Sequence, residues 1–235
     1  MKTKSKAKIF LADDRGLCET CYYRSRQTFN YGNFFSEYKH PFGLLYLLND
    51  IMQAGGSRMH LHAGENSYAM ILPVAGAVNC KKTGAKETTV AAGQLLVYSM
   101  AAGETIESGN PFADAKVNFL QIRLRAADDR GQVNDVLVTF DDLNKNINQL
   151  VNVLPVYAGV LPFTVSIGKF SGRGEAVYPV SKPGAGMFLF VLAGAFEADG
   201  RLLHERDGLA LWDTDEIEME ALSNDAIILL IETAL

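Results

Sequence analysis

A weak internal repeat of short apolar segments constrains the fold more than any other feature of this sequence. The segment Leu72–Val78 (LPVAGAV) recurs 118 positions later, about half of the chain of 235 residues, as Phe190–Phe196 (FVLAGAF). Further along, Gly93–Tyr98 is similar to Gly208–Trp212, so the order of the segments is also kept. Because each copy reads as strands joined by glycine turns, the repeat predicts two β-barrels in one chain.

The apolar runs are short and end at turn residues, which is typical of strands in a sandwich or barrel. Glu216–Ala221 alternates strictly between polar and apolar residues, as a strand with one solvent-facing side does. The Asp199-Gly200 pair is a strong signal for a hairpin turn. The other predicted strands are Gly43–Leu48, Tyr68–Val74, Gln94–Tyr98, Val117–Leu124, Phe163–Phe170, Met187–Leu192, Leu209–Trp212 and Ala226–Ile231.

One segment has the periodicity of a helix instead. Within Asp141–Val151, four apolar residues fall at the i, i+4, i+7 and i+8 positions counted from Leu143, and the two aspartates at its start can cap a helix. We therefore expect a connection with a short helix at residues 126–155. It would join an N-terminal barrel at residues 1–125 to a C-terminal barrel at residues 156–235.

Composition and charge exclude several classes of protein. Hydrophobic residues make up 48% of the chain, which rules out disorder as its main state. The 22 basic and 27 acidic residues give a net charge of −5, and we interpret the basic run Lys2, Lys4, Lys6 and Lys8 as a solvated tail, so no nucleic-acid contact is expected. Neither a membrane span nor a signal peptide is recognised in the sequence, so we expect a cytoplasmic protein that does not contact the membrane.

The three cysteines fit a reducing compartment, because an odd number does not complete a disulfide framework. Cys18 and Cys21 form a C-x-x-C motif, but the βαβ surroundings of a redox site and two further zinc ligands are missing. We predict that both are uninvolved thiols, and that Cys80 packs on a strand.

The sharpest chemical feature is the sequence His60-Leu61-His62. On a strand, residues i and i+2 share one face, so we expect both imidazoles to point the same way, into the barrel. Imidazole binds Fe, Zn, Cu and Ni, but a metal ion normally needs at least three protein ligands. The carboxylates available nearby are Glu65, Glu104 and Glu107. The alternative is a hydrogen-bonded polar pair that binds no metal.

The internal repeat limits a metal site to the first half of the chain. Its offset places Tyr178 and Val180 at the positions of the two histidines, so the second half has no histidine pair at the equivalent place. The second barrel is therefore predicted to be structural.

The string Gly55–His62 (GGSRMHLH) resembles the first metal motif of the pirin family of bicupins, and most closely that of bacterial pirin-like proteins with quercetin-dioxygenase activity. The resemblance extends over nearly the whole chain and implies an all-β fold of two tandem cupin barrels. The other matching pieces are Arg15-Gly16, Ser25–Phe29, Asn33–Phe35, Phe42–Leu44 with Asn49-Asp50, Asp207–Asp213 and Leu229-Leu230.

The resemblance also implies a metal site. Members of the family typically bind iron through two histidines of an H-x-H motif, a third histidine and a glutamate, and the first two carry over as His60 and His62. The stretch that should hold the third histidine, Ser99–Asn110, contains none, and Ile106, Glu107 or Ser108 takes its place depending on the alignment. Extra residues also follow the first motif, between His62 and Tyr68.

Two functional hypotheses follow. In the first, His60, His62 and Glu107 hold a divalent metal, foremost Fe(II) with Ni, Cu or Zn as alternatives, in a quercetinase-like dioxygenase. Its substrate would be a small aromatic or enol-bearing molecule, with Glu107 or Glu65 as the general base. In the second, the metal site has decayed and the protein is a non-catalytic pirin-like module that binds a small molecule or a regulatory protein partner. The fold alone does not decide between them.

Overall fold

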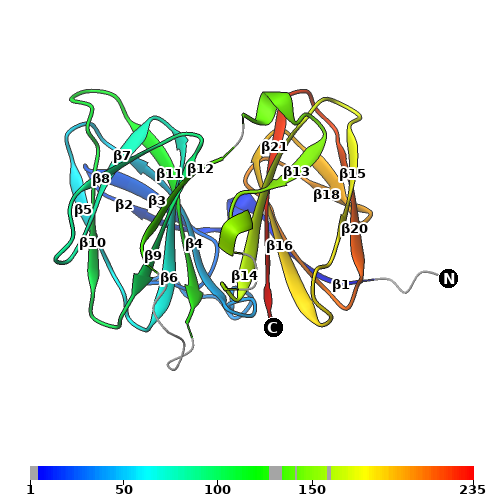
Figure 1. Cartoon of the computed structure of the whole chain (residues 1–235), viewed down its shortest axis with the longest axis horizontal. Helices are drawn as coiled ribbons and strands as arrows, with labels where there is room; N and C mark the ends of the chain where they lie inside the picture. Colours follow the sequence, from blue (N-terminus) through cyan, green and yellow to red (C-terminus); the bar gives the residue numbers. More distant parts are fainter. Residues whose placement is uncertain (1–4, 127–133, 141, 158–159) are drawn as a thin grey trace. The chain divides into compact units, whose positions relative to one another are not determined.

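The computed structural model of the chain describes residues 5–126, 134–140, 142–157 and 160–235. Over these ranges the chain is all-β, with 21 strands and three short 3-10 helices, as the sequence predicts. It divides into two compact units, which we call the N-terminal barrel (Gly16–Phe140) and the C-terminal barrel (Met1–Arg15 with Asp141–Leu235) (Figure 1). No helix in the described part is long and apolar enough to cross a membrane.

The N-terminal barrel consists of a seven-stranded and a four-stranded antiparallel sheet. The larger sheet has the order β12-β9-β6-β11-β4-β3-β2, and its strands are β2 (Gly16–Glu19), β3 (Tyr23–Gln27), β4 (Leu45–Gln53), β6 (Ser67–Ala75), β9 (Gln94–Met100), β11 (Val117–Arg125) and β12 (Val136–Thr139). The smaller sheet has the order β5-β10-β7-β8, and its strands are β5 (Arg58–His62), β7 (Ala77–Lys82), β8 (Thr88–Ala91) and β10 (Thr105–Gly109).

The two sheets of this barrel enclose an apolar core. Alternate residues along each strand point to opposite faces, and the inward ones form one cluster of buried side chains. The larger sheet contributes Ile51, Ile71 and Phe119, among others, and the smaller sheet contributes Leu61 and Ile106. The sheet that carries the His-Leu-His motif, on β5, therefore forms one wall of a packed interior.

The C-terminal barrel repeats this plan. Its six-stranded sheet has the order β1-β19-β16-β21-β14-β13, with β1 (Lys6–Phe10), β13 (Gln149–Asn152), β14 (Phe163–Phe170), β16 (Ala185–Ala193), β19 (Gly208–Trp212) and β21 (Ala226–Ala234). Its four-stranded sheet has the order β15-β20-β17-β18, with β15 (Glu175–Pro179), β17 (Phe196–Ala198), β18 (Arg201–Leu203) and β20 (Glu216–Ala221). The 3-10 helices are η1 (Ala12–Asp14), η2 (Leu143–Lys145) and η3 (Pro155–Tyr157).

The internal repeat is confirmed by the strand order. The run β9-β6-β11-β4 of one barrel corresponds to β19-β16-β21-β14 of the other. The repeated glycines occupy equivalent turns: Gly76 joins β6 to β7 with φ 82°, and Gly194 joins β16 to β17 with φ 76°. Positive φ at both positions explains why glycine stands in each copy of the motif.

The predicted helix at residues 141–151 is wrong. Only Leu143–Lys145 form a single 3-10 turn, and Gln149–Asn152 are β13, which pairs with β14. Asn148, with φ 61°, cannot continue a helix, and Leu150 packs against the apolar core of the C-terminal barrel. The hydrogen-bonded ladder and this burial outweigh a weak helical periodicity. Asp141, a predicted cap, lies outside the described residues.

The division between the barrels also differs from the predicted boundaries of 1–125, 126–155 and 156–235. Strand β12 pairs with β9 of the N-terminal barrel, so that barrel continues past residue 125. Strand β1 pairs with β19 of the C-terminal barrel, so the beginning of the chain completes its second barrel (Figure 1). Lys6 and Lys8 are therefore part of a strand rather than of a solvated tail, while Lys2 and Lys4 lie outside the described residues.

Candidate functional site

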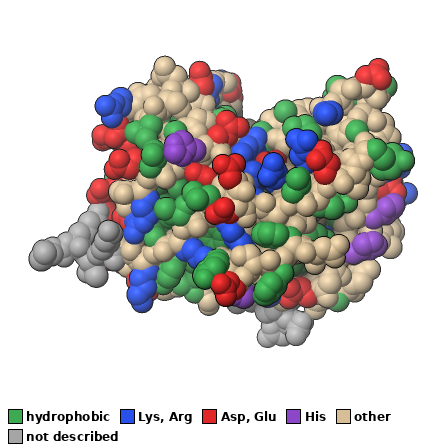
Figure 2. All heavy atoms as spheres, turned by 180° about the vertical axis from the view of Figure 1, so that it is seen from behind, with side chains coloured by type: hydrophobic (Ala, Val, Ile, Leu, Met, Phe, Trp, Pro, Cys, Tyr) green, Lys and Arg blue, Asp and Glu red, His purple; other side chains and the backbone are tan. Residues whose placement is uncertain are grey.

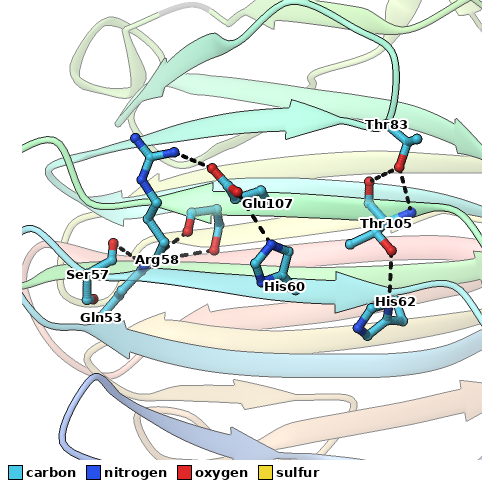
Figure 3. A network of polar contacts seen from close by, with 9 residues as sticks. Gln53, Ser57, Arg58, His60, His62, Thr83, Thr105 and Glu107 are labelled. Carbon is cyan, nitrogen blue, oxygen red and sulfur yellow. Dashed lines mark hydrogen bonds and ion pairs between the residues drawn. The ribbon is translucent and has the colours of Figure 1, made fainter.

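The His-Leu-His motif lies on β5, which pairs in antiparallel register with β10. In this register His60 is opposite Glu107, Leu61 is opposite Ile106, and His62 is opposite Thr105. The register thus brings two of the predicted metal-binding side chains, those of His60 and Glu107, side by side (Figure 3).

These side chains point away from the barrel. Leu61 and Ile106 are 3% and 0% exposed and belong to the apolar core, whereas the side chain of His60 is 58% exposed. The prediction that both imidazoles share one face is confirmed, and the prediction that they point into the barrel is wrong. Because a strand alternates with period two, burying the central leucine turns both histidines to the solvent. Histidine side chains are visible at the molecular surface in Figure 2.

On the outer face, Glu107 is engaged by neighbouring cations. Its carboxylate forms an ion pair with Arg58, and its Oε2 lies 3.4 Å from Nε2 of His60 (Figure 3). Lys81 of β7 stands directly opposite Glu107 in the sheet. The negative charge that would attract a metal ion is therefore already compensated by at least one guanidinium group.

His62 belongs to a separate set of contacts. Its Nδ1 lies 2.9 Å from the hydroxyl of Thr105, and the backbone of Thr105 in turn contacts the hydroxyl of Thr83 (Figure 3). The two imidazoles share a face, but each has its own polar partner. The structure thus places His60 with Glu107, and His62 with Thr105.

The barrel interior beside the motif offers no strong metal ligand. The inward-facing residues of β5 and β10 are Met59, Leu61, Ile106 and Ser108, which carry neither an imidazole nor a carboxylate. Across the described ranges, no three or more His, Cys, Asp or Glu side chains are grouped so that they could hold a metal ion. The residues present therefore do not fit an enclosed iron centre of the His-and-Glu type.

Ser108 is tied into a hydrogen-bond network with the buried Gln53. Its hydroxyl donates to Oε1 of the buried Gln53 over 3.4 Å, and its carbonyl accepts from Nε2 of Gln53 over 3.1 Å. The same amide donates to the carbonyl of Ser57 over 2.9 Å. This network ties β4, β5 and β10 together, so its polar atoms serve the fold.

The two other candidate carboxylates, those of Glu65 and Glu104, have partners away from the two histidines. Glu65 forms an ion pair with Arg125 at 3.0 Å, and Glu104 accepts a hydrogen bond of 2.8 Å from the backbone N–H of Ala101. The first contact joins the loop before β6 to the end of β11, and the second lies within the turn between β9 and β10. A role of Glu65 as general base stays a prediction, and its carboxylate is held by a guanidinium group in this structure.

One important residue was missed by the sequence reasoning. Arg123 on β11 is 1% exposed, and its guanidinium group donates to the carbonyl oxygens of Leu61, over 3.0 Å, and of His62. It therefore fixes the backbone of the motif from inside the barrel. A signal was present, because Arg123 has the same strand parity as the buried Val117 and Phe119.

Cys80 packs on a strand, as the sequence predicts, and the uninvolved role of Cys18 and Cys21 stays a prediction. Cys80 is buried in the core of the N-terminal barrel, where desolvation raises the pKa of its thiol to about 12, so it stays protonated. Cys18 lies on β2, whereas Cys21 is exposed in the following turn. Both are free thiols, and they join no metal-binding group within the described residues.

Comparisons with known proteins agree with this architecture. Residues 163–233 match the family model of the quercetinase C-terminal cupin domain. No curated protein sequence matches the chain. Among solved structures, YhhW from Escherichia coli superposes with a TM-score of 0.85 at 17% identity, covering 97% of each chain.

Two further structures extend the comparison. YhhW of Escherichia coli in complex with nickel(II) gives a TM-score of 0.82 at 19% identity and covers 97% of this chain and 99% of that one. Quercetin 2,3-dioxygenase from Acinetobacter baumannii gives a TM-score of 0.72 at 14% identity, and the match covers 97% of this chain and 79% of that one. At these identities the likeness concerns the fold. The C-terminal barrel thus matches the quercetinase C-terminal cupin model, and the whole chain has the two-barrel fold of the bacterial pirin YhhW.

Proposed function

We propose that this protein is a non-catalytic pirin-like bicupin that acts by binding a partner. The observation that carries the proposal is the inward pair Leu61 and Ile106, which fills the wall of the N-terminal barrel with hydrocarbon. The only histidines of the motif are directed to the solvent. In a metal-dependent oxygenase the ligands would instead converge on an enclosed, water-excluding pocket that holds the substrate.

The inward side chains of Leu61 and Ile106 stabilise the folded barrel. Burying each of these two side chains stabilises the fold by about 1.5–3 kcal/mol relative to leaving it exposed. An imidazole at the same position would need a metal ion or a hydrogen-bond partner, since an unpaired buried polar group is costly. The inward positions therefore contribute to stability, and the chemistry implied by the family is not supported by the side chains that occupy them.

The binding residues we assign are Arg58, His60, His62 and Glu107 on the outer face of the sheet β5-β10-β7-β8. Small ligands generally bind in concave sites that bury most of their surface. An open face with both charges and exposed hydrogen-bonding groups is better suited to a macromolecular partner. The open, charged face therefore supports a protein partner rather than a small molecule as the ligand of a non-catalytic protein.

The test is metal content together with oxygenase activity. Untagged protein purified without chelator would be measured by elemental analysis, beside His60→Ala/His62→Ala and beside YhhW, a relative whose nickel complex is known. Flavonol turnover in air would be followed after addition of Fe(II), Ni, Cu or Zn. We expect far less than one metal ion per chain and no turnover.

The opposite outcome is equally clear. Near one metal ion per chain, lost in the double histidine variant and accompanied by flavonol turnover, would contradict the proposal. It would support instead the metal-dependent dioxygenase hypothesis with His60, His62 and Glu107 as ligands.

A further inference from the structure

A buried arginine inside the N-terminal barrel has no carboxylate partner in the described part of the chain. Arg123 on β11 is 1% exposed, and its side chain lies on the same inward face of the strand as Val117 and Phe119. Among the described residues its guanidinium group forms no ion pair with an aspartate or a glutamate. Taking a charged group out of water is costly unless other groups compensate the charge. The barrel must therefore compensate this charge in another way.

Neutral oxygen atoms surround the guanidinium group of Arg123. It donates hydrogen bonds to the backbone carbonyl of Leu61, over 3.0 Å, and to that of His62. Gln121, oriented with its amide oxygen toward the arginine, accepts from Nε over 3.2 Å and from Nη2 over 3.3 Å. Asn49 stands opposite Gln121 on β4, and its buried Oδ1 has no hydrogen-bond donor among the described residues. This part of the barrel therefore has a surplus of oxygen acceptors, an environment that suits a cation.

The oxygen atoms that accept from Arg123 belong to both sheets of the barrel. Leu61 and His62 lie at the end of β5, which is the edge strand of the small sheet, whereas Gln121 lies on β11 of the large sheet (Figure 1). An edge strand leaves part of its backbone without a strand partner. The guanidinium group thus links the two sheets and holds the end of β5, as a bound metal ion does when its ligands come from different strands.

We propose that the carbonyl oxygens of Leu61 and His62, together with the amide oxygen of Gln121, form a cation site inside the N-terminal barrel. The guanidinium group of Arg123 is the permanent occupant of this site. Because the chain supplies the positive charge itself, the barrel is linked across its two sheets without a metal ion. The same charge repels a divalent cation that approaches the interior.

Chemical rescue of the full chain tests the proposal. Arg123→Ala keeps Cβ and removes a group of the size and charge of ethylguanidinium, so this cation fits the space that the substitution leaves. Ethylurea has nearly the same shape and also donates hydrogen bonds, but it is neutral. The variant is unfolded and refolded with either compound, and its melting temperature is then measured. Arg125→Ala, which removes a partly exposed guanidinium group paired with Glu65, is treated in the same way as the control.

We expect Arg123→Ala to melt about 4–10 °C below the wild-type protein, because three oxygen acceptors lose their buried donor. Ethylguanidinium should recover at least about half of this loss, and the recovery should grow with its concentration, as for a ligand that binds only the folded state. Ethylurea should have no more effect on Arg123→Ala than on Arg125→Ala.

A second pair of variants decides the question if Arg123→Ala does not fold. Arg123→Lys keeps the positive charge, whereas Arg123→Met fills a similar volume without it, so we expect Arg123→Lys to melt at the higher temperature. Three results would overturn the proposal: equal rescue by ethylurea and ethylguanidinium, no rescue of a folded Arg123→Ala, or an Arg123→Met at least as stable as Arg123→Lys. The rescue involves no partner and no metal ion, so its failure would leave the proposed function to its own test.

Discussion

Leu61 and Ile106 stand directly opposite each other on β5 and β10, and both side chains lie in the core of the N-terminal barrel. This relationship fixes the orientation of everything around it. The residues next to Leu61 are His60 and His62, and the residue after Ile106 is Glu107, so all three side chains are directed outward. The same contact thus stabilises the barrel and keeps the motif at its surface.

The first prediction separates the inward residue from its outward neighbour. Leu61→Ala should lower the free energy of unfolding by about 2–5 kcal/mol, because it leaves a cavity in a packed core. His60→Ala should change it by within about 0.5 kcal/mol, as is usual for exposed side chains. Urea unfolding of both variants measures the difference. Equal effects would mean that the histidine is part of the core.

The second prediction concerns the buried guanidinium group. Arg123→Met should cost about 1–3 kcal/mol, because the carbonyl oxygens of Leu61 and His62 lose a buried donor. Hydrogen exchange should quicken in β5 before it does in other strands. Arg125→Met is the matched control, because its partner Glu65 is partly exposed and such pairs contribute about 0–1 kcal/mol. Similar losses in both variants would contradict a special role for Arg123.

The third prediction is a pH dependence of stability from Cys80. Burial raises the pKa of its thiol to about 12 from 9.0, so the unfolded chain loses this proton at a lower pH than the folded chain does. The stabilisation is therefore complete below pH 9 and falls as the pH rises from 9 toward 12, by up to about 1.4 kcal/mol per pH unit. Burial raises the pKa of Tyr98 as well, which acts in the same direction.

Urea unfolding between pH 7 and pH 10.5 measures this slope. Cys80→Ala should reduce the slope above pH 9, whatever its effect on stability at neutral pH. Cys21→Ala, at an exposed thiol, should leave the slope unchanged. An unchanged slope in Cys80→Ala would show that this thiol does not cause the loss.

The fourth prediction concerns a buried carboxylate in the C-terminal barrel. Glu232, 3% exposed, accepts hydrogen bonds from the hydroxyl of Tyr178 over 3.0 Å, from the backbone and hydroxyl of Ser181, and from the backbone of Lys182. Hydrogen bonds to a charged group contribute about 1.5–3 kcal/mol each. Glu232→Ala should therefore lower the free energy of unfolding by more than the about 1.5–3 kcal/mol of one such hydrogen bond. It should also quicken hydrogen exchange at residues 181 and 182.

Glu205→Ala is the control for this variant, because the Glu205 carboxylate is largely exposed and should contribute about 0–1 kcal/mol. If Glu232→Ala unfolds at the same urea concentration as Glu205→Ala, the hydrogen-bonded carboxylate of Glu232 does not stabilise the C-terminal barrel.

The sequence by itself determined the fold class and much of the strand pattern. Short apolar segments, glycine turns and the repeat at Gly76 and Gly194 are local signals, and β6–β7 and β16–β17 follow them closely. Period-two alternation also predicted that His60 and His62 share a face. Each of these features depends on residues that are near one another in the chain, so it can be recognised without knowing the partners.

Only the tertiary structure decided which face the histidines take, where β1 pairs, and that residues 149–152 form a strand. Alternation defines two faces but does not say which one meets the opposite sheet, and burial of Leu61 against that sheet made the choice. Strand β1 pairs with β19, some 200 positions away, and β13 replaces a predicted helix because β14 supplies a ladder of hydrogen bonds. These outcomes depend on contacts between distant segments, whose free energy exceeds the local preference of either segment alone.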